Sequence, residues 1–218
     1  MNLSVFSVIS VLVLSLCSCG GKKTAQKPVQ DEVSYVLDST YIFDGRTLDG
    51  WEITNFGPQG PVEISSGTIV LGMGDGCTGI TYKKPFPEIN YEVSLEAKRV
   101  SGTDFFCGLT FPVGKDPCTL IVGGWGGTVV GLSSIDGQDA SDNETMINRK
   151  FEKGQWYRIR LQVTDSTIKA WIDDEQQVNF NYKGRALSIR PEVNLSKPFG
   201  IASWCTTAAL RNIRVKRI

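Results

Sequence analysis

Residues 43–51 read Phe43-Asp44-Gly45-Arg46-Thr47-Leu48-Asp49-Gly50-Trp51. Each Asp-Gly pair indicates a tight turn, because glycine adopts backbone conformations that other residues avoid and aspartate can bond to its own backbone. The tryptophan directly after the second turn is typical of an aromatic anchor that brings the chain back to a core. The segment therefore predicts a turn-rich entry into a folded domain.

Short runs of alternating apolar and polar residues follow this segment. Residues 91–97 alternate strictly, which places Tyr91, Val93, Leu95 and Ala97 on one face of a strand. Glycine and aspartate separate such runs, and neither an amphipathic helix of useful length nor an internal repeat is evident. The pattern predicts an all-β domain. Further strands are expected at 104–111, 119–122, 129–133, 156–163, 167–172, 177–180, 199–204 and 210–215.

A late meander carries a family resemblance. Residues 154–163 read GQWYRIRLQV, and after a Thr-Asp-Ser turn the chain returns as IKAWIDDEQQV. With FDGRTLDGW and the closing segments 199–204 and 209–215, this pattern resembles the DUF1080 family, the 3-keto-disaccharide hydrolase domain. The resemblance implies a concanavalin-like jelly-roll β-sandwich of two antiparallel sheets over residues 39–218. Trp51, Trp156 and Trp171 lie in the strands and turns of this pattern, and we expect all three to be buried structural residues.

The first residues predict export. Residues 1–16 are almost wholly apolar or serine, which is typical of a signal peptide rather than a membrane span. Leu16 and Ser18 precede Cys19 as in a lipoprotein signal, so we expect a signal peptide over 1–18, a lipidated Cys19 and a flexible tether over 19–38. An ordinary secretory peptide is the alternative. The expected location is the cell envelope, with the lipid anchor on the membrane.

Composition excludes several classes of function. The chain has 23 basic and 23 acidic residues, so charge gives no case for nucleic acid. The chain contains no histidine, which excludes Ser-His-Asp and Cys-His catalysis and histidine metal sites. No phosphate-binding glycine motif indicates a nucleotide. An enzyme of this composition must use carboxylates, Tyr, Lys, Arg or an oxygen-ligated metal.

Four cysteines fall in the expected domain: Cys77, Cys107, Cys118 and Cys205. An exported location permits disulfides, and Cys107 and Cys118 flank a short loop that could allow a cross-strand bridge. Four buried, unpaired thiols are an equal alternative, because a large sandwich does not need disulfide bonds for its stability. The sequence leaves their pairing open.

The resemblance implies hydrolysis of 3-keto glycosides, but one strand departs from the family. Many members carry a carboxylate in a mid-domain strand, where this chain reads CTLIVGGWGG over residues 118–127. Catalytic residues therefore cannot be carried over at that strand. The departure favours the alternative of a non-catalytic, lectin-like glycan-binding module.

Two residues are candidates beside this strand. Glycines flank Trp125 on both sides, which lets a ligand approach the indole face, and sugars stack on such faces. A core tryptophan beside a bulge is the alternative. Asp104 follows Ser-Gly-Thr at the start of a strand, where family members tend to place a polar residue facing the ligand groove. A turn or capping aspartate is the alternative.

The loop over residues 135–144 is the third candidate, because it gathers four acids and an asparagine. Such a cluster suits sugar hydroxyls or a calcium ion, or another divalent metal with oxygen ligands, while a solvated loop is the alternative. We expect Asp104, Asp139 and Glu144 as acid/base catalysts and a substrate site on the concave sheet. The expected substrate-binding residues are Trp125, Asp136, Asn143 and Arg149, with Arg149 as a partner for an oxyanion.

Overall fold

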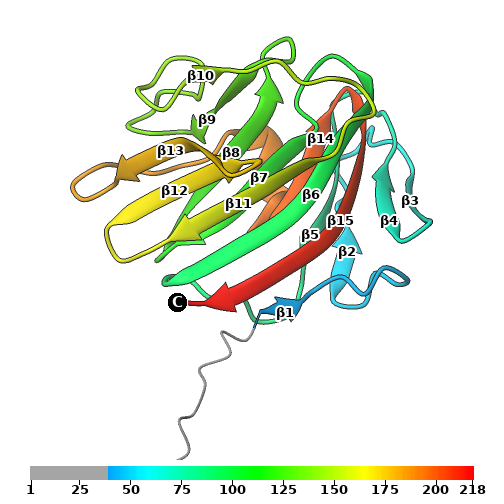
Figure 1. Cartoon of the computed structure of the whole chain (residues 1–218), viewed down its shortest axis with the longest axis horizontal. Coiled ribbons are helices and arrows are strands. Elements are labelled where there is room, and N and C mark those ends of the chain that lie inside the picture. The colour runs from blue at the N-terminus through cyan, green and yellow to red at the C-terminus, as the bar shows by residue number, and fades with distance from the viewer. Residues whose placement is uncertain (1–38) are drawn as a thin grey trace, which may run out of the picture. The chain divides into compact units, whose positions relative to one another are not determined.

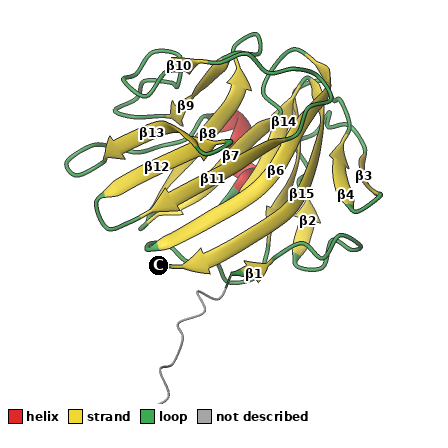
Figure 2. Cartoon of the chain, in the orientation of Figure 1, coloured by secondary structure: helices red, strands yellow, loops and turns green. Residues whose placement is uncertain are grey.

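The computed structural model describes residues 39–218, which form two packed antiparallel sheets (Figure 1). The signal peptide, Cys19 and the tether lie outside the described residues. Within them, the one helical element is η1, a short 3-10 helix over Pro191–Ser196 (Figure 2). Among the same residues no helix is long and apolar enough to cross a membrane.

The eight-stranded sheet, here called sheet A, has the order β13-β12-β11-β6-β15-β4-β3, and β1 also pairs with β15. Its longest strands, β6 and β15, lie side by side and extend across the front of Figure 1. Its strands are β1 (Thr40–Tyr41), β3 (Val62–Ser65), β4 (Thr68–Leu71), β6 (Tyr91–Gly102), β11 (Tyr157–Val163), β12 (Thr167–Ile172), β13 (Glu175–Asn181) and β15 (Thr206–Arg217).

The seven-stranded sheet, sheet B, has the order β10-β9-β8-β7-β14-β5-β2. The helix η1 packs against β5 and β14 of this sheet. Its strands are β2 (Trp51–Ile53), β5 (Cys77–Tyr82), β7 (Cys107–Val113), β8 (Asp116–Gly124), β9 (Val129–Ser133), β10 (Ile147–Asn148) and β14 (Gly200–Trp204).

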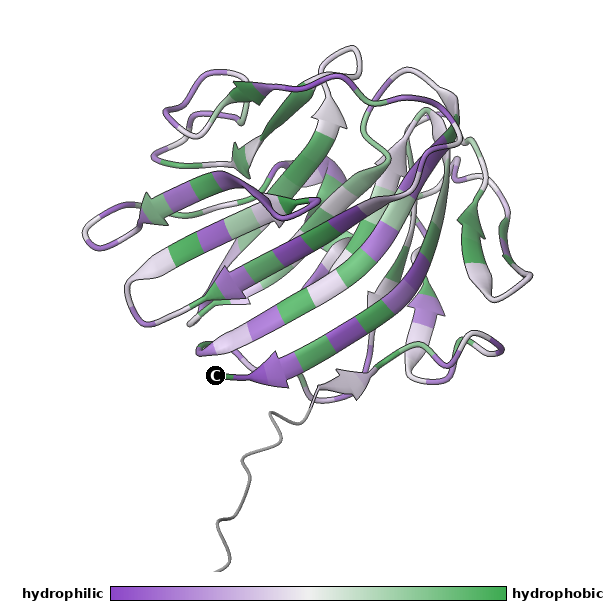
Figure 3. Ribbon diagram, viewed as in Figure 1, coloured by the Kyte–Doolittle hydropathy of each residue, from purple (hydrophilic) through white to green (hydrophobic). Residues whose placement is uncertain are grey.

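The expected sandwich is confirmed, and the alternation of side chains explains it. Figure 3 shows apolar and polar bands alternating along β6, β11 and β15, as a sheet with one buried face requires. The apolar members of both sheets meet in one core that includes Tyr91, Leu95, Phe111, Leu120 and Phe199. The predicted strands are all present, whereas β1, β2, the β3–β4 hairpin, β5 and β10 were not predicted. The last strand returns beside the first, because β15 pairs with β1.

The segment 43–51 forms a loop tied down at both ends. The Asp44 carboxylate accepts hydrogen bonds from the backbone N–H groups of Arg46 and Thr47, each at 2.7 Å. Trp51 is 7% exposed, and its indole N–H donates to the Ile42 carbonyl oxygen at 2.6 Å. This bond joins the two ends of the loop across the aromatic anchor, so Trp51 is structural as expected.

Trp156 and Trp171 differ from the expectation, because neither belongs to the core. Both lie half-buried on the outer face of sheet A. The Arg211 guanidinium lies over Trp156 at 4.1 Å, and the Arg160 guanidinium lies over Trp171 at 3.7 Å. Alternation along each strand sends these side chains outward, opposite to their buried neighbours Tyr157 and Ile172.

All four cysteines of the described domain are free, and three of them are buried. Cys107 lies opposite Val122 and Cys118 lies opposite Phe111, so these two cysteines are not cross-strand partners. Burial raises the pKa of both thiols to about 12. The two thiols behave as small apolar core residues, and no bridge joins them.

Candidate functional site

A cavity of about 220 Å³ opens on the face of sheet B that points away from sheet A. Strand β8 shows how the sequence builds this face: Leu120 and Val122 point into the core, whereas Thr119 and Ile121 point outward and line the cavity. The helix η1 and the residue before it line one side. Other lining residues are Asp104, Phe105, Trp125, Ser133, Arg190, Glu192, Val193 and Trp204.

Aromatic side chains form the apolar part of this cavity. Trp125 is 40% exposed although it is large and apolar. Phe105 and Trp204 lie together in the wall, with ring centroids 6.5 Å apart. Flat aromatic surface beside a few polar groups is typical of a small-ligand site. Trp125 is therefore available to a ligand and is not the core residue that was the alternative.

The backbone around Trp125 departs from regular strand geometry. The register between β8 and β9 shifts at Val122/Gly124, which marks a bulge. Trp125 has φ +46°, a left-handed conformation that is uncommon for a bulky residue. Such strain persists only where the surroundings enforce it, and it concentrates at functional sites.

Arg99 holds the strained loop around Trp125 in this conformation. It is 5% exposed, and its guanidinium donates to the carbonyl oxygens of Gly123 at 3.1 Å and Gly127 at 3.0 Å. Its Nε also donates to the carbonyl oxygen of Asp104 at 3.2 Å. Burial lowers the pKa of Arg99. One buried cation thus holds both the glycine loop and the turn that carries Asp104.

The Asp104 carboxylate lies at the cavity and forms no ion pair, although the buried Arg99 guanidinium is near enough to interact with it electrostatically. It accepts hydrogen bonds from the backbone N–H of Phe105 at 2.7 Å and of Gly126 at 3.4 Å. Among the salt bridges of residues 39–218, none includes Asp104. The Asp104 carboxylate is therefore oriented by backbone groups, and no ion pair occupies it.

Arg190 is the cation of the cavity, and the sequence analysis did not identify it. Its guanidinium pairs with the Asp139 carboxylate on one side and with Glu192 at 2.9 Å on the other. Asp139 also accepts hydrogen bonds from Ser133 at 3.2 Å and Ser134 at 2.9 Å. Asp139 thus contacts two residues that line the cavity, Ser133 and Arg190, and holds the Arg190 guanidinium in place. The hydrogen bond from Arg190 lowers the pKa of Glu192, which keeps that carboxyl charged.

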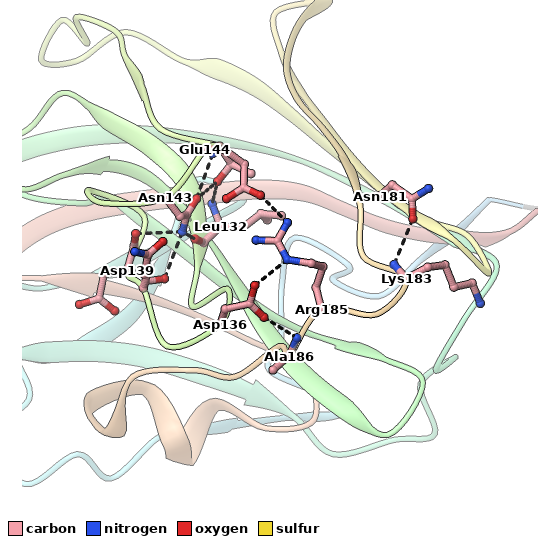
Figure 4. A network of polar contacts seen from close by, with 11 residues as sticks. Leu132, Asp136, Asp139, Asn143, Glu144, Asn181, Lys183, Arg185 and Ala186 are labelled. Atoms are coloured by element: carbon pink, nitrogen blue, oxygen red, sulfur yellow. Dashed lines mark hydrogen bonds and ion pairs between the residues drawn. The ribbon is translucent and has the colours of Figure 1, made fainter.

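Asp136 and Glu144 form a separate network with Arg185 (Figure 4). Arg185 donates to Asp136 at 2.6 Å and to Glu144 at 2.5 Å. The Ala186 backbone N–H and Arg185 lower the pKa of Asp136, and the Arg185 hydrogen bond lowers the pKa of Glu144. Neither carboxylate lines the cavity. The structure therefore does not bring them together with Asp104 and Trp125.

Asn143 and Arg149 also lie away from the cavity. Asn143 is 7% exposed, and its amide donates to the carbonyl oxygens of Leu132 and Asp139 (Figure 4). Its side-chain oxygen accepts from Thr145, so the whole amide is used inside the loop. Arg149 pairs with Asp173 at 3.2 Å and Glu175 at 2.9 Å at the β12–β13 turn. Both residues were expected to contact the substrate, but their side chains stabilise loops instead.

In the loop over residues 135–144, for which sugar hydroxyls, a calcium ion or plain solvation were the open interpretations, three of the four carboxylates pair with arginines. Asp136 and Glu144 contact Arg185, and Asp139 contacts Arg190. Within residues 39–218, no group of three or more His, Cys, Asp or Glu side chains is arranged to hold a metal ion.

Sequence reasoning missed Arg190, Glu192 and Trp204. The one available signal was the long segment between the strands expected at 177–180 and 199–204, since long irregular connections often carry function. Pairing of β14 with β7 and β5 then brings Trp204 beside Phe105. These contacts join residues about a hundred positions apart in the chain.

Three solved structures share the fold. A candidate glycosyl hydrolase from Parabacteroides distasonis has a TM-score of 0.53 at 15% identity, covering 83% of this chain and 94% of that one. The carbohydrate binding module CBM66 from Bacillus subtilis has a TM-score of 0.53 at 15% identity, covering 77% and 95%. The Crh5 transglycosylase in complex with NAG has a TM-score of 0.58 at 15% identity, covering 82% and 83%.

Sequence comparison gives the family. Among curated protein sequences none matches the chain significantly. Residues 38–216, almost the whole sandwich, match the 3-keto-alpha-glucoside-1,2-lyase-like domain. The jelly roll and this match agree with the pattern that begins at Phe43, and the chain belongs to the family of 3-keto-alpha-glucoside-1,2-lyase-like domains.

Proposed function

We propose that the domain cleaves glycosides whose sugar carries a ketone at C3, by elimination across C1 and C2. The observation that carries this proposal is the Asp104 carboxylate, which shares one cavity with an exposed indole and a guanidinium. The family match supports the substrate class. The fold shared with a candidate glycosyl hydrolase and a transglycosylase supports carbohydrate as the ligand.

The chemistry needs a base and a group that stabilises negative charge. The C3 ketone acidifies the C2–H bond, so a carboxylate can remove that proton and leave an enolate with charge on the ketone oxygen. The enolate electrons then form the C1–C2 double bond and expel the C1 oxygen, which takes a proton from the protonated base or from water. Addition of water to the resulting enone completes a net hydrolysis.

Three side chains of the cavity have proposed roles in this chemistry. Asp104 is the proposed base, because no direct ion pair occupies its carboxylate and two backbone N–H groups orient it. Arg190 is the proposed partner of the enolate oxygen, in place of Arg149, and Asp139 is a positioning residue behind it. Trp125 is the proposed platform for the sugar ring.

The test is turnover of a chromogenic 3-keto-glucoside by the purified mature chain, with and without chelator. Asp104→Asn should lower turnover by about 10²–10⁴-fold, the usual contribution of a general base, while the melting temperature stays near wild type. Glu63→Gln is the matched control, because Glu63 is an exposed carboxylate on β3 of the other sheet. Wild-type turnover in Asp104→Asn would exclude Asp104 as the base.

The second candidate function is glycan binding without turnover. The aromatic wall of the cavity and the fold shared with a carbohydrate binding module favour it. A glycan array separates the two functions: sugar binding that Trp125→Ala abolishes, with no turnover of any 3-keto-glucoside, would support the binding module and contradict the lyase.

A further inference from the structure

A row of five side chains crosses the outer face of sheet A, away from the cavity of sheet B. Cross-strand partners define it: Trp171 on β12 lies opposite Arg160 on β11, and Arg160 lies opposite Ser94 on β6. Ser94 in turn lies opposite Arg214 on β15, and Arg214 lies opposite Tyr41 on β1. The order is aromatic, arginine, serine, arginine, aromatic. We call it the arginine row.

Each arginine of the row is held flat by the aromatic ring at its end. The Arg160 guanidinium lies 3.7 Å from the centre of the Trp171 ring, and the Arg214 guanidinium lies 3.9 Å from the centre of the Tyr41 ring. Stacking orients the planar group and turns its N–H donors outward at the edge. In Arg160 one of these donors already contacts Glu92, and the others can bind an anion, whereas Arg214 lies in no salt bridge of the described residues. Adjacent strands are about 4.8 Å apart, so the two arginine backbones are roughly 10 Å apart with Ser94 between them.

The small Ser94 side chain leaves space between the two arginines. A hollow of about 260 Å³ lies there. It is lined by Ser94, Trp171 and Asn212, the arginines Arg158, Arg160 and Arg214, the carboxylates Glu96 and Asp174, and Leu95 and Ile159. A hollow of this kind suits a compact charged group rather than a flat apolar surface.

The carboxylates near the row are already engaged. Glu92 contacts Arg160 and Lys216, each at 3.1 Å. Glu96 accepts from Arg211 at 2.6 Å and from Asn212 at 2.6 Å. Across residues 39–218, Arg214 takes part in no salt bridge. Asp174 pairs with Arg158 at 2.5 Å. Around the hollow, the five cations Arg158, Arg160, Arg211, Arg214 and Lys216 outnumber the three carboxylates Glu92, Glu96 and Asp174, in a chain whose charges balance overall.

We propose that the arginine row binds the carboxylate or sulfate group of an anionic sugar. The guanidinium edges of Arg160 and Arg214 and the Ser94 hydroxyl donate to its oxygens, and charge-assisted bonds of this kind are short and strong. A glycan fits better than a membrane surface, because the chain belongs to the family of 3-keto-alpha-glucoside-1,2-lyase-like domains and, of the two aromatics, only Tyr41, which is 52% exposed, could insert into a bilayer. The site is independent of the proposed elimination.

The test measures binding to the purified mature chain by calorimetry. Hexameric oligogalacturonate and a sulfated oligosaccharide are the probes, and carboxyl-reduced oligogalacturonate is the neutral control. We expect binding to at least one charged probe, none to the reduced sugar, and weakening at high salt. Arg214→Gln and Arg160→Gln should each weaken binding about tenfold or more.

Two variants distinguish specific binding in the hollow from nonspecific attraction to the positive charge of this face. Lys169→Gln removes one positive charge from β12, outside the hollow, and should leave affinity within about twofold. Ser94→Glu should abolish binding while the fold remains, because the new carboxylate would occupy the space between the arginines.

Four results would overturn the proposal. They are no binding to either charged probe, equal binding to the reduced sugar, equal losses from Lys169→Gln and Arg214→Gln, and full binding by a folded Ser94→Glu. Arginine-dependent binding to anionic lipid vesicles, without binding to either charged sugar, would assign the face to a membrane instead. Because turnover is not measured, these outcomes do not depend on the role of Asp104.

Discussion

At the scale of single residues, tryptophan stabilises this fold in different ways at different positions. Trp51 is enclosed by Tyr82 and Phe199, with ring centroids 5.0 and 5.8 Å away. Trp156 lies on the outer face of sheet A, between the cations of Lys98 and Arg211. The first tryptophan contributes through burial, whereas the second contributes through cation–π contacts beside solvent.

This difference predicts unequal costs of truncation. Trp51→Ala should lower the free energy of unfolding by about 3–5 kcal/mol, as for a buried aromatic residue. Trp156→Ala should lower it by only about 1–2 kcal/mol, because two surface cation–π contacts are lost. Urea unfolding of both variants checks this, and equal losses would show that Trp156 is as important to the core as Trp51.

At the scale of elements, two loops build the cavity of sheet B. The glycine loop 123–127 carries Trp125 and is bonded to Arg99 from within the sandwich. The loop between β9 and β10 carries Asp139 and is closed by Asn143 inside and by Arg185 outside. Arg99 orders the first loop and Arg185 orders the second, and no local sequence pattern indicates either role.

The glycine loop can be tested with two matched alanines. Gly123 has φ +78°, and an added Cβ would lie 2.5 Å from Arg99 Nη2, whereas Gly126 has φ +83° with nothing within 4 Å. Gly126→Ala should cost about 1 kcal/mol from backbone strain alone, and Gly123→Ala about 1–3 kcal/mol more from the clash. Urea unfolding measures both costs. Equal costs would mean that Arg99 moves aside freely.

Arg185 should make the stability of the second loop depend on pH. The folded pKa values of Asp136 and Glu144 are lowered below their unfolded values of about 3.9 and 4.3. Their contribution is therefore present above about pH 4 and is lost as the pH falls through the folded pKa values.

The measurement is the melting temperature of wild type and Arg185→Gln between pH 2 and pH 7, which spans about the whole titration of both carboxyls. We expect Arg185→Gln to melt below wild type at pH 7 and the gap to shrink as the pH falls below about 4. Lys183→Gln is the control, since Lys183 forms no salt bridge within the described domain. A gap that stays constant with pH would contradict the prediction.

At the scale of the whole molecule, the sandwich keeps two polar faces apart. The cavity with Asp104 and Trp125 opens on the outer face of sheet B, and the arginine row crosses the outer face of sheet A. Strand alternation produces both faces, because each strand that contributes to the core also sends every second side chain outward. The two faces can therefore be altered independently by substitution.

At the same scale, a lipid anchor is expected at Cys19, which lies outside the described residues. Leu16 and Ser18 before Cys19 favour acylation of that cysteine. We expect the mature protein to partition into the detergent phase, and Cys19→Ala to release it into the aqueous phase. Cys17→Ala is the matched control and should remain in detergent. Detergent partitioning of Cys19→Ala at the wild-type level would exclude this anchor.

The sequence by itself determined the architecture. Period-two alternation and Asp-Gly turns are local signals, so residues 91–97 and 43–51 indicated strands and turns without any tertiary information. The segment 43–51 and the late meander then gave the family. Asp104 and Trp125 were recognisable for the same reason, because flanking glycines and a turn position are visible in the neighbouring sequence.

Only the tertiary structure decided which polar residues share the cavity. Arg190 and Trp204 reach it through the packing of η1 and the pairing of β14, contacts between segments distant in the chain. Local sequence could not show that Asp136 and Glu144 bind Arg185 while Asp139 binds Arg190, because both arginines come from the later irregular segment. The arginine row likewise exists only through strand register, which sets side by side residues as distant as Tyr41 and Arg214.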